Sequence, residues 1–134
     1  MPKFKLLVIN ESNQQNPELL QTLDFQQMEH TEILASSDIE NSILDIKPDL
    51  ILYECKNQQQ AAEYNDLLFS FAQHPDIPVI IIGNIQMLEN NFDNLLNQNY
   101  TFIPKPYHAL DLIGKIHSAI YVKLRKSLLH AARN

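Results

Sequence analysis

Polar residues follow several apolar runs of the sequence, and their types suit a cation or phosphate site. The run PDLILY is followed by Glu54, and the run FKLLVI is followed by Asn10 and Glu11. Lys105 stands between two prolines after the run YTFI. Carboxylate and amide oxygens bind hard cations, and an ammonium neutralises phosphoryl oxygens. Whether these groups can act together depends on the elements that carry them.

The apolar runs have the length of strands and alternate with stretches of helical period. Continuous apolar runs predict strands that are covered on both faces, and two shorter runs also have the length of strands. Together they predict five strands, at 4–9, 31–34, 50–53, 78–83 and 100–103. The stretches between them carry helix starts, such as Asn16 before Pro17 and the capping box of Ser37 and Glu40. A further, weaker helix is expected near 87–97. We therefore predict one α/β domain, a doubly wound (βα)5 unit with a parallel five-stranded sheet, whose strands end at a common site.

Composition narrows the class of protein. A chain of 134 residues with 45% apolar residues fits one globular domain. The net charge of −6 argues against direct nucleic-acid contact by this domain, because phosphate binding needs clustered Lys and Arg. No apolar run is long enough for a membrane span, and no signal peptide opens the chain. With Cys55 as its single cysteine, we expect a cytoplasmic protein.

Four motifs give the chain a family resemblance. LLVINES, KPDLILYE, IPVIIIGN and FIPKPY stand in the order seen in receiver domains of bacterial response regulators. The resemblance extends from Lys5 to about Ser118 and implies a receiver fold, which is flavodoxin-like. We accordingly expect an atypical receiver domain at 1–118, and at 119–134 an extension of the last helix toward a dimer partner or a following domain.

The resemblance places the family's functional positions on particular residues of this chain. The acid pair that holds Mg²⁺ falls on Asn10 and Glu11, and the phosphoacceptor aspartate falls on Glu54. The hydroxyl residue falls on Gly83 and the lysine on Lys105. Only the lysine is the residue that the family uses, so the expected phosphorylation pocket is degenerate.

These departures bear on phosphoryl transfer, which depends on positioning and charge neutralisation. The side chain of Glu54 is one methylene longer than aspartate, and a misplacement of roughly an ångström can cost about 10²-fold in rate. Gly83 has no hydroxyl to follow a phosphoryl group. We therefore expect no catalytic residue and no switching by phosphorylation. We also expect no metal, and Glu11 and Glu54 are the weak candidates for Mg²⁺.

Glu54 is expected to pair with Lys105 instead. The simplest interpretation is an ion pair that satisfies two charges at the edge of the sheet. The alternative, that Glu54 imitates a phosphorylated aspartate, is less favoured because position 83 has no hydroxyl to respond. The resemblance also implies a cis peptide bond before Pro106.

The last helix is longer than one face of the sheet requires. From Tyr107 to about His130 it carries an apolar stripe of Leu110, Ile113, Ile116, Ile120, Leu124 and Leu128. The part up to Ile120 is expected to face the core. Beyond it the stripe needs a second copy or a further domain. We take Ile113, Ile116, Ile120, Leu124 and Leu128 as candidate residues of a dimer or interdomain contact, and a homodimer as the expected state.

The degenerate pocket and the long helix are similar to those of FleQ-type activators, which depend on sigma-54 and control flagellar genes. The resemblance implies ATPase and DNA-binding domains elsewhere in the full-length chain, with ATP and cyclic di-GMP bound by the ATPase domain and no cofactor in this one. The alternative is a stand-alone pseudo-receiver, an adaptor that binds another two-component signalling protein. The open reading frame beyond residue 134 would distinguish the activator module from the stand-alone adaptor.

Overall fold

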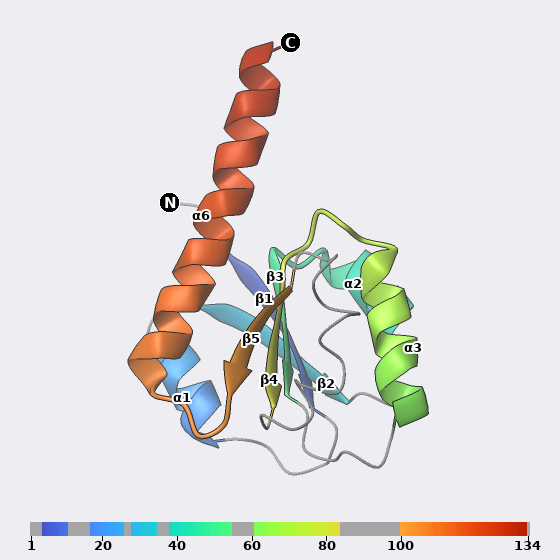
Figure 1. Cartoon of the computed structure of the whole chain (residues 1–134), viewed down its shortest axis with the longest axis vertical. Coiled ribbons are helices and arrows are strands. Elements are labelled where there is room, and N and C mark those ends of the chain that lie inside the picture. The colour runs from blue at the N-terminus through green and yellow to red at the C-terminus, as the bar shows by residue number, and fades with distance from the viewer. Residues whose placement is uncertain are drawn as a thin grey trace.

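A computed structural model describes residues 4–10, 17–25, 28–34, 38–54, 61–83 and 100–133. Its strands form one parallel sheet in the order β2-β1-β3-β4-β5 (Figure 1). The strands are β1 (Lys5–Asn10), β2 (Glu29–Leu34), β3 (Leu50–Glu54), β4 (Val79–Gly83) and β5 (Tyr100–Pro104). The chain builds outward from β1 to one edge and then to the other, so the predicted doubly wound sheet is confirmed.

The described helices are α1 (Pro17–Phe25), α2 (Ile39–Ile46), α3 (Ala61–Ala72) and α6 (Ala109–Arg133). Asp38 caps α2 by accepting a hydrogen bond from the Asn41 backbone N–H at 3.2 Å, so the capping box predicted from Ser37 is wrong by one position. Lys47 ends the same helix in the left-handed conformation, before Pro48 as predicted. The helix expected near 87–97 lies outside the described residues.

Strict alternation along the strands divides the core into two layers. Leu7 and Ile9 of β1 pack with the buried faces of α2 and α3. Leu6 and Val8, which point the other way, pack with α1 and the first half of α6. The central strands are buried on both faces, because helices cover the sheet from each side (Figure 1).

Asp49, which directly precedes β3, joins the amino end of this strand to the start of β1 and to α6. Its carboxylate accepts a hydrogen bond from the Lys5 backbone N–H at 2.8 Å, and Lys123 Nζ of α6 lies 3.6 Å from Asp49 Oδ1. Contact between α6 and the domain therefore reaches Lys123, one turn beyond the Ile120 limit predicted from the sequence.

Beyond that point α6 projects past the amino edge of the sheet (Figure 1). In the part of the chain that the structure describes, no helix combines the length and apolar character needed to cross a bilayer.

Candidate functional site

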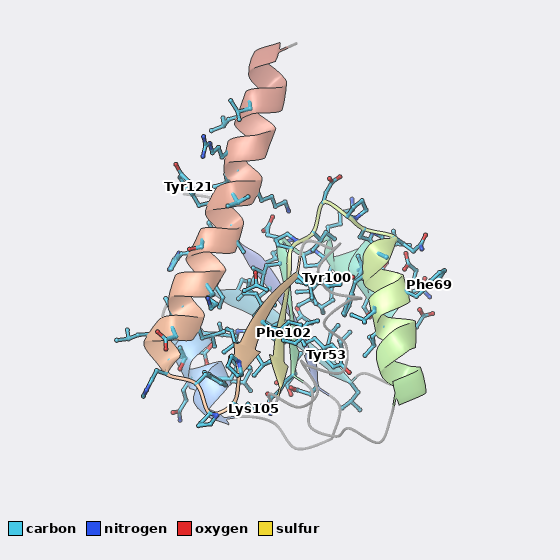
Figure 2. The ribbon with its side chains drawn as sticks, in the orientation of Figure 1. Tyr53, Phe69, Tyr100, Phe102, Lys105 and Tyr121 are labelled. Atoms are coloured by element: carbon cyan, nitrogen blue, oxygen red, sulfur yellow. The ribbon has the colours of Figure 1, made fainter. Side chains whose placement is uncertain are left out.

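Three of the predicted site residues meet on one face at the carboxyl edge of the sheet. Asn10 and Glu54 are register partners at the ends of β1 and β3. Each continues the face occupied by Leu6 and Val8, or by Leu50 and Leu52. Lys105 follows β5 directly and reaches the same face. Figure 2 shows Lys105 at this edge, where β5 leads into α6.

Glu54 and Lys105 form the predicted ion pair. Lys105 Nζ donates to Glu54 Oε1 at 2.9 Å, and the two side chains are 30% and 4% exposed. Removing a carboxylate from water costs several kcal/mol unless a partner compensates for the lost hydration. The lysine therefore allows a charged Glu54 to lie inside the domain, which is the structural role expected of this pair.

Gly83 contributes only its backbone to the site. Its carbonyl oxygen accepts a hydrogen bond from the Lys105 backbone N–H at 2.9 Å, and Gly83 is the register partner of Pro104. The peptide bond between Lys105 and Pro106 is cis, as the family resemblance implied. The backbone thus fixes where Lys105 leaves the strand, and no hydroxyl is present at position 83.

Glu32 of β2 belongs to the same cluster, although it was not predicted from the sequence. Asn10 Nδ2 donates to Glu32 Oε1 at 2.7 Å, and Asn10 is 1% exposed. The available signal was a charged residue inside the short run TEIL, because charged side chains are common on the edge strands of sheets. Its partner could not be read from the sequence, because the pairing depends on β1 lying beside β2.

The described residues fit Mg²⁺ poorly. The two carboxylates of the cluster, Glu32 and Glu54, are already hydrogen-bonded to Asn10 and Lys105. Among the described residues, the buried Asn10 Oδ1 has no hydrogen-bond partner. The same residues contain no group of three or more His, Cys, Asp or Glu side chains that could hold a metal. Mg²⁺ binds through carboxylates with near-ideal octahedral geometry, which one neutral amide oxygen does not supply. Glu11, the other predicted ligand, lies outside the described residues.

The predicted contact residues of α6 differ in how far they are exposed. Ile116 and Ile120 are 0% and 4% exposed and pack into the core, so they are not available to a partner and that part of the prediction is wrong. Ile113 is half-buried. Leu124 and Leu128 are 47% and 71% exposed, and the structure places them on the projecting part of the helix.

Sequence comparison gives no relative, whereas comparison of structures gives many. No protein-family model matches the chain, and a search of curated proteins finds no match. A crystal structure of NtrX from Brucella abortus is similar with a TM-score of 0.77 and 21% identity over 98% of this chain. This chain spans only 30% of that NtrX chain.

Two similar structures are receiver domains of nearly the same size. A CheY-like receiver domain protein from Methanospirillum hungatei has a TM-score of 0.76 and 19% identity, covering 93% of this chain and 99% of that one. The receiver domain of nitrogen regulatory protein C has a TM-score of 0.71 and 16% identity, covering 90% and 97%. At these identities the likeness concerns the fold, and this chain has the fold of a response-regulator receiver domain.

Proposed function

We propose that this chain is a regulatory receiver module of a bacterial transcription activator, and that aspartyl phosphorylation does not set its state. The observation that carries the proposal is the ion pair between Glu54 and Lys105. In the receiver fold the end of β3 bears the phosphoacceptor, and here that position holds a buried glutamate whose Oε1 lies 2.9 Å from an ammonium. The domain has no catalytic role in this proposal.

The neighbouring positions support the same conclusion. Gly83 offers no hydroxyl that could follow a phosphoryl group, and Asn10 replaces an acid with an amide that donates to Glu32. A receiver that cannot change at this edge can still present a fixed surface to other domains. We therefore propose that the module acts by contacting a second copy of itself and other domains, as a homodimer within a longer activator.

The finer assignment is a FleQ-type, sigma-54-dependent regulator of flagellar genes. It is supported by the degenerate pocket and by the continuation of α6 beyond the sheet. In this assignment ATP and cyclic di-GMP bind a separate ATPase domain, and DNA binds a further one. Deletion of the gene is expected to change transcript levels of flagellar operons, and unchanged levels would contradict this assignment.

A phosphorylation assay tests the central claim. We expect incubation with acetyl phosphate and Mg²⁺ to leave the intact mass unchanged, while a receiver with aspartate at the end of β3 gains a phosphoryl group. Beryllofluoride, which mimics that group, should leave the amide spectrum of the chain unaltered. Stoichiometric modification of Glu54 would overturn the proposal.

A further inference from the structure

The outward face of α6 carries a regular stripe that the domain does not use. Opposite the buried Leu112, Ile116 and Ile120, the helix presents residues spaced by alternating steps of four and three. We call this set the outer stripe, and it consists of Leu110, Gly114, His117, Tyr121, Leu124 and Leu128. Leu110 is 83% exposed and Tyr121 is 65% exposed. Figure 2 shows Tyr121 pointing away from the sheet.

This spacing is that of a helix seam. Steps of four and three keep successive side chains on one side of a helix, and such a repeat typically packs against a second helix. The stripe runs along α6 from Leu110, near the carboxyl edge of the sheet, to Leu128 on the projecting part. A partner helix that packs on the stripe would therefore contact both the part of α6 that lies on the sheet and the part that projects beyond it.

Gly114 is not explained by packing within the chain. A Cβ atom added at this position would meet nothing within 4 Å. A glycine inside a helix lowers helix stability relative to alanine, and its missing side chain permits a close approach of another group. No other part of the described chain approaches Gly114 in this way, so the glycine favours contact with a second molecule.

The stripe is complementary to itself when it is reversed. If a second α6 runs antiparallel, Leu110 faces the partner's Leu128, Gly114 faces the partner's Leu124, and His117 faces the partner's Tyr121. The leucine then fills the space that Gly114 leaves. In a parallel pair Gly114 would face Gly114 and leave a gap, which costs packing energy.

Charged residues beside the stripe also favour antiparallel pairing of the two α6 helices. Asp111 and Arg125 are both exposed and lie on the same flank of the stripe. In an antiparallel pair, residues on the same flank face each other, so each Asp111 lies near the partner's Arg125. A parallel pair would place this flank against the opposite flank and lose both attractions. Opposite charges across a seam set the orientation of paired helices.

We propose that two copies of this chain pair through the outer stripe, with their α6 helices antiparallel. The proposal rests on the homodimer proposed above and specifies its surface and direction. It keeps Leu124 and Leu128 from the contact predicted from the sequence and leaves out Ile116 and Ile120, which face the core. It also brings the tail of each copy beside the start of the partner's α6, the end of the helix that follows Lys105.

Cysteine cross-linking tests the direction of pairing. In a Cys55→Ser background, Leu110→Cys and Leu128→Cys are made separately, both at exposed positions where the fold should tolerate the change. We expect oxidation of an equimolar mixture to give a covalent dimer that joins the two variants, and each variant alone to give little. Dimers formed by each variant alone, without the mixed product, would show a parallel pair and overturn the proposal.

Charge reversal tests the surface in the otherwise unmodified chain. Asp111→Arg alone should weaken self-association by about tenfold in sedimentation velocity, and Asp111→Arg with Arg125→Asp should restore it. A chain that stays monomeric at all concentrations and gives no cross-link would overturn the pairing. That result leaves the phosphorylation assay unaffected, so failure of the interface can be told from failure of the unswitched receiver.

Discussion

The carboxyl edge of the sheet and the outward face of α6 depart from ordinary burial in opposite directions. At the edge, Asn10 and Glu54 are polar and buried, and each is held by a named partner, Glu32 or Lys105. On the helix, Leu110 and Leu128 are apolar and exposed. Asn10 Nδ2 and Glu54 thus find partners within one copy, whereas the apolar helix face is where we propose that a second copy packs.

The largest expected effect comes from breaking the edge. Lys105→Met should lower the free energy of unfolding by about 3 kcal/mol, because it leaves the buried Glu54 carboxylate without its ammonium. Urea denaturation measures the change. Lys105→Met combined with Glu54→Met should recover most of the loss, since both charges are then removed. If the double variant does not recover the lost stability, Lys105 is not the main partner of Glu54.

A second test at the edge changes Asn10. Asn10→Asp should lower stability by about 2 kcal/mol at neutral pH, because a carboxylate replaces the donor that lies 2.7 Å from Glu32 Oε1. Protonation removes the repulsion, so the loss should shrink as the pH falls. Adding Glu32→Gln restores a donor and should restore stability at neutral pH. A loss that is independent of pH would contradict the proposed contact.

On the helix face a smaller effect of opposite sign is expected. Gly114→Ala should raise the free energy of unfolding of the monomer by about 1 kcal/mol, because alanine favours the helix and its Cβ has open space. Thermal unfolding at low protein concentration measures it, with the exposed Ser118→Ala as a control for ordinary helix propensity. A decrease in stability would show that Gly114 has a contact within the monomer.

The smallest effect is expected on the projecting part of α6. Leu128→Ala should change monomer stability by less than about 0.5 kcal/mol, because Leu128 is 71% exposed. Ile116→Ala on the inward face is the matched control and should cost about 3 kcal/mol. If both variants lose similar amounts in the monomer, the division of α6 into two faces is wrong.

Much of the fold could be predicted because its signals are local. The continuous apolar runs predicted the strands to within two residues, and Pro17 and Pro48 marked a helix start and a helix end. The capping residue of α2 was missed because Ser37 and Asp38 are adjacent and both suit the position. The edge residues Glu54, Gly83 and Lys105 were found because each stands at the end of an apolar run or within two residues of it.

By itself the sequence determined the order and type of the elements and the chemical groups at the strand ends, because hydrophobic period and turn residues act over a few positions. Only the tertiary structure decided which groups meet. Asn10 finds Glu32, 22 residues away, because β1 lies beside β2, and Lys123 reaches Asp49, 74 residues away, because α6 runs back along the sheet. The same packing buried Ile116 and exposed Leu128, since only the sheet defines which side of α6 is inside.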